Sequence, residues 1–410
     1  MKLFADSALS FIDERPDAAA RRVAWSDFER EGLPTTSDEV WRYAPLGALD
    51  LDNYRVPRDA QVRSDSDFAA MLCARAGMVV RVVDGFCVST GQPVDGVVVE
   101  STSSLSGTDL EQRYRSDTFA ILNAALAPAT TVIRVSPGVV VDQPIVVLHR
   151  SNATSSFPRT QIVLGRGASA TVVEYFEGGE KAFVVPISEY EVGDNASLQL
   201  VTYQHLAPSA WHLARTTGFV YRDARLRQAI IGFGGHYNRS RNDAELRGTG
   251  GENELRTTFL GSGDQVHDFR THQLHLGARS RSTLLSKGAV ADRSRSVYTG
   301  LIEIEKGAKR TDARQTNHNL LLSPAAHADS VPNLDIREND VVCAHASSVG
   351  PLDELQCWYL ESRGVTHEDA QRLMIQGFFY EMLTTLPPEL AGLVETDVAA
   401  VLATLGALAS

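Results

Sequence analysis

The sequence lacks the features of a membrane protein, a disulfide framework and a zinc knuckle. No run of eighteen apolar residues could span a bilayer, and the N-terminal stretch carries acids where an export signal has an apolar segment. The four cysteines, Cys73, Cys87, Cys343 and Cys357, include no C-x-x-C pair. We therefore expect a cytoplasmic protein with reduced cysteines, of which Cys73, Cys87 and Cys357 serve packing.

The sequence also lacks the common nucleotide-binding and hydrolase motifs. No G-x-x-x-x-G-K-[ST] loop is present, and no G-x-S-x-G nucleophile elbow. We therefore predict that the chain does not hydrolyse ATP and carries no catalytic triad. The formal net charge of −12 disfavours nucleic acid and anionic membranes as partners, because both would be repelled at long range.

At 410 residues the chain is too long for one ordinary core, and three regions differ in pattern. Residues 1–78 are predicted to be a helical region. Residues 79–350 contain short β-rich runs, beginning with those at 79–83, 97–99 and 131–135, and a helical insert is expected near 110–126. Residues 351–410 are predicted to form a C-terminal helical domain, interrupted at Pro387-Pro388.

A short turn that leads into a strand recurs through the β-rich region. Its second residue is at positions 168, 196, 224, 252, 278 and 308, so the spacings are 28, 28, 28, 26 and 30. The paired residues are Gly167-Ala168, Asn195-Ala196, Asp223-Ala224, Gly251-Glu252, Gly277-Ala278 and Gly307-Ala308. A sustained period with no room for a helix predicts a mainly β fold, a β-solenoid whose ends are covered by the helical regions. A large antiparallel sandwich is the alternative, although its strands usually recur every 8 to 12 residues.

Two groups of residues are candidate metal ligands. His267, His272 and His275 lie on one expected strand, but His272 points to the opposite face and the other two are about 26 Å apart, so we expect solvent-facing or partner-facing histidines. Cys343 and His345 are two residues apart on a strand and therefore share a face. Thiolate and imidazole are ligands of iron and iron–sulfur centres, but two ligands do not complete a site. On spacing alone, core packing of Cys343 with a hydrogen-bonded His345 is the favoured interpretation.

The C-terminal part of the chain resembles a known family. The segments that carry the resemblance are Lys287-Gly288, Gly300-Leu301-Ile302, Thr311-Asp312-Ala313-Arg314-Gln315, Asn319-Leu320-Leu321-Leu322-Ser323, Pro332-Asn333-Leu334-Asp335-Ile336, Asp340-Val341-Val342-Cys343-Ala344-His345, Val349-Gly350-Pro351-Leu352-Asp353 and Tyr359-Leu360-Glu361-Ser362-Arg363-Gly364. They are similar to the shared core of the SufB/SufD family of iron–sulfur cluster assembly scaffolds. Glu39-Val40-Trp41-Arg42-Tyr43 is similar to the family's N-terminal entry, and residues 50–130 resemble it least.

This resemblance implies a right-handed parallel β-helix and a non-catalytic scaffold subunit of the SUF system. It implies a heterodimer with a SufB-like chain, joined through the β-helix ends, and SufC-like ATPases bound to the C-terminal helices, where Leu373, Phe378 and Met382 lie. His345 occupies the position of the family histidine implicated in building the cluster, with Cys343 before it. The cluster, or iron, would be held transiently at the partner interface, with no tightly bound cofactor in the isolated chain.

Two departures favour the SufD branch of the family. The SufB branch has its scaffold cysteine nine residues before the histidine, where this chain has Ile336, and a glutamate after the histidine, where this chain has Ala346. Two other functions stay open at the level of sequence. One is a secreted-type β-helix enzyme acting on carbohydrate, and the other is a SufD-like homodimer with a binding role only.

Overall fold

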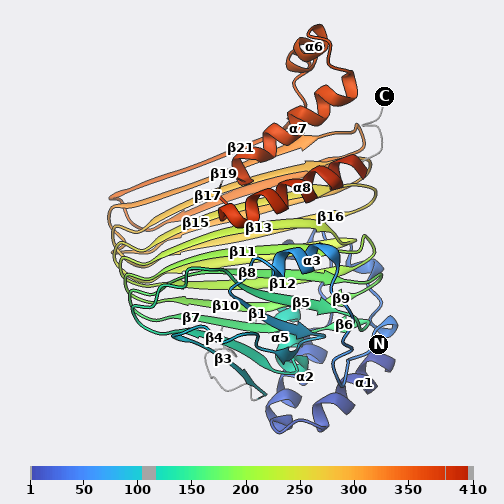
Figure 1. Ribbon diagram of the computed structural model, residues 1–410, viewed down its shortest axis with the longest axis vertical. Coiled ribbons are helices and arrows are strands. Elements are labelled where there is room, and N and C mark those ends of the chain that lie inside the picture. The colour runs from blue at the N-terminus through green and yellow to red at the C-terminus, as the bar shows by residue number, and fades with distance from the viewer. Residues whose placement is uncertain (1, 104–116, 384, 405–410) are drawn as a thin grey trace.

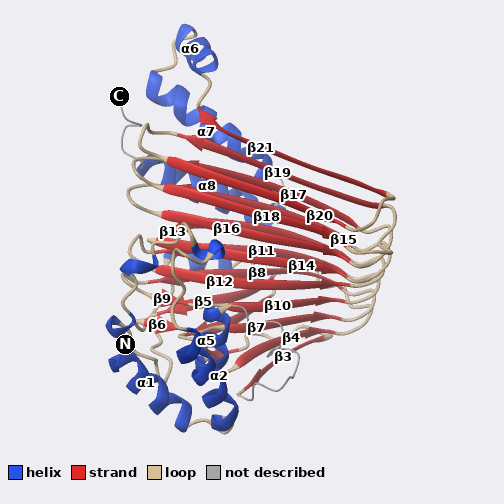
Figure 2. Ribbon diagram, turned by 180° about the vertical axis from the view of Figure 1, so that it is seen from behind, coloured by secondary structure: helices blue, strands red, loops and turns tan. Residues whose placement is uncertain are grey.

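The computed structural model describes residues 2–103, 117–383 and 385–404, which form a long stack of parallel strands with helices at both ends (Figure 1). The strands alternate between two sheets along the chain, so that each coil of the solenoid adds one strand to each sheet (Figure 2). The fold is therefore mainly β, a β-solenoid flanked by helical regions, which confirms the predicted class.

The first sheet has ten strands among the described residues. In spatial order they are β2 (Phe86–Ser89), β1 (Met78–Val83), β5 (Ile145–Ser151), β8 (Ser169–Gly178), β11 (Ser197–Leu206), β13 (Arg225–Gly234), β15 (Glu252–Gly261), β17 (Arg281–Val290), β19 (Thr311–Leu321) and β21 (Val341–Pro351).

The second sheet has eleven described strands. They are β20 (His327–Ile336), β18 (Arg295–Ile304), β16 (Val266–His275), β14 (Tyr237–Leu246), β12 (Trp211–Val220), β10 (Ile187–Val192), β7 (Arg159–Leu164), β4 (Thr130–Val135) and β3 (Val97–Thr102). In addition, β9 (Phe183–Val184) pairs with β12, and β6 (Ser155–Ser156) pairs with β9. The β1, β3 and β4 ranges include the three β-rich runs that the sequence predicts.

The helical segments lie before the first strand, in one insert and after the last strand. They are α1 (Lys2–Asp13), α2 (Ala18–Glu31), the short 3-10 turns η1 (Glu39–Trp41), η2 (Leu46–Ala48) and η3 (Leu51–Asn53), α3 (Asp67–Cys73), α5 (Thr118–Leu126), α6 (Glu354–Ser362), α7 (His367–Leu383) and α8 (Pro388–Thr404). The insert expected near 110–126 is helical at α5, and residues 110–116 of it lie outside the described residues. No described helix is long and apolar enough to cross a bilayer.

One turn residue per coil has a left-handed backbone and forms a column along the solenoid. These residues are Gly167, Asn195, Asp223, Gly250, Arg279 and Arg310. Each donates its backbone N–H to the carbonyl oxygen of the equivalent turn one coil further on, as from Asn195 to Arg222 at 2.8 Å. Glycine, asparagine and aspartate tolerate this conformation best, which explains the predicted period. The last three turns depart from the predicted pairs. Their left-handed residues in this column are Gly250, Arg279 and Arg310, whereas the predicted pairs are Gly251-Glu252, Gly277-Ala278 and Gly307-Ala308.

The interior between the sheets changes from apolar to polar along the stack. The first coils pack valine, isoleucine and leucine, such as Val80, Val147 and Ile162. Later coils bury amides, hydroxyls and imidazoles, and His267 and His275 are fully buried there. The expectation that these two histidines face solvent or a partner is therefore wrong. The strand alternation that separates them from His272 is as predicted, since His272 is partly exposed and pairs with Glu303.

The terminal helices cover two different parts of the stack (Figure 1). The α1, α2 and α5 helices share an aromatic core with the β9 and β12 strands, in which Trp25 packs on Phe4 and Phe28. By contrast, α3, α7 and α8 lie on the outer face of the ten-stranded sheet, where their apolar residues meet Tyr175 and Tyr203. Helices from the N-terminal and C-terminal regions thus cover the same face of the ten-stranded sheet.

Candidate functional site

Cys343 and His345 lie on β21, the last strand of the ten-stranded sheet, at the open end of the stack. In the parallel register Cys343 is opposite Ala313 and His345 is opposite Gln315 of β19. Ala313 and Gln315 are both buried in the interior, so Cys343 and His345 project from the interior face of the last coil. The structure thus confirms that the two side chains share a face.

The surroundings of the two side chains differ in exposure. Cys343 packs against the apolar cluster of Ile302, Ile304, Ala308 and Ala313, whereas His345 is exposed. Burial, with a smaller effect of the Asp312 carboxylate, raises the pKa of the Cys343 thiol. The thiol therefore keeps its proton at neutral pH, and it becomes a metal ligand only when a cation or a positive partner group displaces that proton.

The facing strand β20 completes the rim of this open end. Its Ile336 is opposite Ile304 of β18, an interior residue, and is 43% exposed. Ser330 on the same strand reaches Ser347 of β21, with their hydroxyl oxygens 2.7 Å apart. The rim therefore joins two sheets and presents a thiol, an imidazole and aliphatic side chains.

Both rim strands are sheet edges among the described residues, since β20 pairs only with β18 and β21 only with β19. Their unpaired backbone groups face the end of the stack, and exposed apolar side chains accompany them. These are Val331, Leu334, Ile336, Val342 and Val349. Natural proteins usually block or cover a long sheet edge, because it otherwise pairs with another strand. This end is therefore suited to an interface with another protein.

The C-terminal helices carry the second predicted set of residues, in three different environments. Leu373 is 51% exposed, Phe378 is half-buried beside the Lys287 ammonium, and Met382 is buried. Sequence reasoning missed a more exposed group on α6, namely Leu355, Trp358 and Tyr359. Because α6 is short and has no clear apolar period, the sequence gives no signal for this group.

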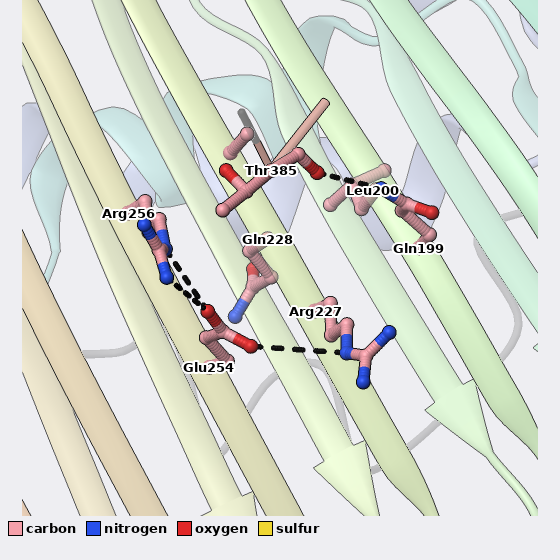
Figure 3. A pocket seen from close by; sticks show the side chains of 8 residues that line it. Gln199, Leu200, Arg227, Gln228, Glu254, Arg256 and Thr385 are labelled. Atoms are coloured by element: carbon pink, nitrogen blue, oxygen red, sulfur yellow. Dashed lines mark hydrogen bonds and ion pairs between the residues drawn. The ribbon is translucent and has the colours of Figure 1, made fainter. Parts of the chain in front are cut away.

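A cleft of about 230 Å³ lies where the turn before α8 passes over the ten-stranded sheet (Figure 3). Its single lining carboxylate, Glu254, lies 2.9 Å from Arg256 and 3.7 Å from Arg227. Thr385 accepts a hydrogen bond from Gln199 at 3.0 Å through its carbonyl oxygen. A carboxylate neutralised by two guanidiniums is a poor general acid or base, so this cleft gives no support to glycoside cleavage, which needs two carboxyl groups.

These observations define the class of protein: a β-solenoid with one open end, which carries a thiol and an imidazole, and an exposed helical arm. The family described as "SUF system FeS cluster assembly, SufBD core domain" matches residues 146–378. The match includes the strands from β5 to β21 and most of α7.

Curated relatives agree with this match. The chain is 28% identical to the "Iron-sulfur cluster assembly protein SufD" of Escherichia coli over 368 residues, which are 88% of this chain and 87% of that protein. It is 34% identical to the SufD of Bacillus subtilis over 274 residues, 65% of this chain and 63% of that protein. It is 29% identical to "Protein ABCI7, chloroplastic" of Arabidopsis thaliana over 381 residues, 86% and 79% of the two chains.

The chain belongs to the SufB/SufD family of iron–sulfur cluster assembly proteins, and within that family to the SufD branch. Ile336 fits this branch, since an aliphatic side chain at the rim cannot ligate iron.

Proposed function

We propose that the chain is a non-catalytic scaffold subunit of a cytoplasmic SUF complex, paired with a SufB-like chain through its last coil. The rim of β20 and β21 carries this proposal, because it combines open strand edges, exposed aliphatic side chains and two metal-ligating groups. A partner strand would satisfy the unpaired backbone groups and bury the aliphatic residues.

In this proposal the iron–sulfur cluster is the cargo of the interface. His345 supplies an imidazole from the exposed part of the rim, and Cys343 supplies a thiolate once a cation displaces its proton. Because two ligands do not complete a tetrahedral iron site, the SufB-like chain contributes the remaining thiolate. The cluster is transferred onward, and the isolated chain holds no tight cofactor.

The energy source is a SufC-like ATPase that binds the C-terminal helices. Exposed Leu373 on α7, with Leu355 and Trp358 on α6, offers the binding surface, while Phe378 packs α7 against the sheet and Met382 is buried. Since α7 also contacts β15 and β17, a pull on α6 and α7 would reach the last coils and open the rim to iron and sulfide.

The experiment compares His345→Ala with His327→Ala, because His327 is an exposed histidine of the same coil on its outer face. Each variant is co-purified with a SufB-like and a SufC-like partner and reconstituted anaerobically with iron and sulfide. We expect both complexes to assemble, but only His345→Ala to lose most of its bound iron and sulfide. Wild-type cluster yield from His345→Ala would remove His345 from the mechanism.

The interface is tested separately by Ile336→Asp, which places a charge among the aliphatic residues of the rim. The substituted chain should elute as a monomer where the wild type elutes with its SufB-like partner. If the wild type without that partner associates with itself as strongly as it binds the partner, the result would instead favour the homodimer.

A further inference from the structure

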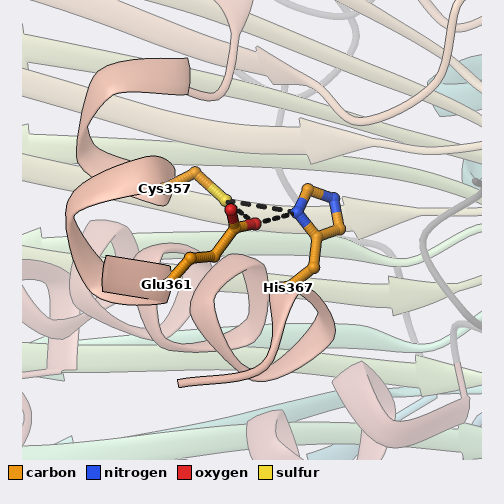
Figure 4. A group of neighbouring side chains, drawn as sticks. All are labelled: Cys357, Glu361 and His367. Atoms are coloured by element: carbon orange, nitrogen blue, oxygen red, sulfur yellow. Dashed lines mark hydrogen bonds and ion pairs between the residues drawn. The ribbon is translucent and has the colours of Figure 1, made fainter. Parts of the chain in front are cut away.

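A second group of metal-ligating side chains lies in the helical arm formed by α6 and the start of α7, which follows the rim strand β21 in the chain (Figure 1). Figure 4 shows that Cys357 and Glu361 of α6 and His367 of α7 point toward one another. The Cys357 Sγ atom lies 3.6 Å from His367 Nδ1 and 3.7 Å from Glu361 Oε1. The same Glu361 oxygen contacts His367 Nδ1, so all three ligand atoms lie within 4.8 Å of one another.

These separations suit one small ion. A tetrahedral Zn²⁺ holds sulfur at about 2.3 Å and nitrogen or oxygen at about 2.0 Å, so its ligand atoms are roughly 3.5 Å apart. The two distances from the sulfur already match this value. A small rotation of the His367 ring away from the carboxylate would admit the ion.

The local sequence determines this arrangement. Cys357 and Glu361 are four residues apart and so lie on one face of α6. Gly364, with a φ of 88°, ends α6 in a left-handed turn that reverses the chain. Thr366 then caps α7 by accepting the backbone N–H of Asp369 at 3.2 Å, which places His367 in its first turn, facing the cysteine.

The helical arm has little else to hold it together. Cys357 is the only buried residue of α6, and the large apolar residues Leu355 and Trp358 are 77% and 64% exposed. A nine-residue helix that buries one side chain gains too little from burial to stay fixed, and small units of this kind commonly use a metal as a cross-link.

We propose that Cys357, Glu361 and His367 form a site for a divalent cation of borderline softness, for which Zn²⁺ is the best fit. Thiolate and imidazole favour Zn²⁺ over Mg²⁺ and Ca²⁺, which prefer oxygen ligands. The His367 and Glu361 side chains are 63% and 35% exposed, so the fourth position faces solvent or a ligand from a bound partner. The cation would cross-link α6 to α7 and set the angle of the arm. This site does not depend on the proposed cluster assembly.

The test titrates Zn²⁺ into the purified, chelator-stripped full chain in competition with a chromophoric chelator. Cys357→Ser and His367→Gln should each weaken Zn²⁺ binding at least about tenfold. Removing a metal ligand should lower the affinity at least as much as removing a residue that only orients the ligand. Co²⁺ in place of Zn²⁺ should give a thiolate charge-transfer band that Cys357→Ser abolishes. Excess Mg²⁺ should not compete, and Fe²⁺ in a parallel titration shows which borderline cation binds more tightly.

The matched control is His327→Gln, which removes an exposed histidine that belongs to neither group and should bind Zn²⁺ like the wild type. A parallel titration of Cys343→Ser/His345→Ala assigns the ion: loss of binding there, with retention in Cys357→Ser/His367→Gln, would move the ion to the last coil and overturn the proposal. Because the His367 side chain is exposed, His367→Gln should fold, which far-UV circular dichroism checks. As a second readout, Zn²⁺ should slow hydrogen exchange of α6 amides in the wild type and leave it unchanged in His367→Gln.

Discussion

Three histidines inside the solenoid should make the protein sensitive to mild acid. Burial lowers the pKa of His212, His267 and His275 from 6.5 to about 4. Asn238 links the first two, because its carbonyl oxygen lies 3.0 Å from His212 Nδ1 and its amide nitrogen 3.4 Å from His267 Nδ1. The Asn238 amide N–H donates to His267 Nδ1, which is therefore the acceptor. Protonation of Nδ1 would place two hydrogen-bond donors against each other.

The sign and size of the effect follow from this difference in pKa. The folded state keeps the rings neutral, while the unfolded chain protonates them below pH 6.5. Stability is therefore complete above that pH and falls as the pH drops from 6.5 to about 4. At pH 5 each ring costs about 2 kcal/mol relative to pH 8, or about 6 kcal/mol for the three.

Urea unfolding followed by tryptophan fluorescence at pH 8 and at pH 5 measures this loss. His267→Gln replaces the ring with an amide that does not titrate, so the pH-dependent part of its free energy of unfolding should shrink by about 2 kcal/mol. His345→Gln serves as the control, because it makes the same substitution at an exposed position instead of a buried one. Equal pH dependence in His267→Gln and wild type would refute the assignment of neutral buried rings.

Three further substitutions test two packing contacts and one turn of the solenoid. Gly288→Ala would place a methyl group 1.9 Å from the Phe259 ring and should cost about 1–3 kcal/mol in urea unfolding, whereas Gly350→Ala, with open space around it, should cost less than about 0.5 kcal/mol. Phe379→Ala removes a buried ring from the core under α7 and should cost about 3–5 kcal/mol, seen also as faster proteolysis of α7; an unchanged digestion pattern would argue against this packing. Asn195→Val should lower the melting temperature and Asn195→Gly should not, because a β-branched residue tolerates the left-handed turn poorly; equal melting temperatures would contradict a left-handed turn there.

The solenoid could be predicted because its repeat depends on local chemistry. A left-handed turn position selects glycine, asparagine or aspartate, and three successive coils keep it at a spacing of 28 residues, from Gly167 through Asn195 to Asp223. Where a loop changes length, as before Arg279, the pattern in the sequence no longer marks the turn. Side-chain direction along a strand is equally local, which is why the shared face of Cys343 and His345 could be predicted.

The missed features depend on neighbours that the sequence does not place. The stacking of coils decides whether an alternating strand turns its histidines inward, so the sequence alone predicts the wrong environment for His267 and His275. Cys357 has no sequence partner in a C-x-x-C pattern, and its group forms only because the Gly364 turn returns His367 to it. The one available signal was the spacing of four between Cys357 and Glu361.

The shared cover of the ten-stranded sheet has a consequence for synthesis on the ribosome. The outer side chains Tyr175 and Tyr203 belong to middle coils, yet their cover includes α8, and the Tyr203 hydroxyl bonds Asp397 on that helix. A nascent chain can therefore stack its coils in order while an apolar face stays uncovered until α8 has emerged. Stop codons ahead of Pro388 should thus leave products that chaperones retain, even though every strand is present.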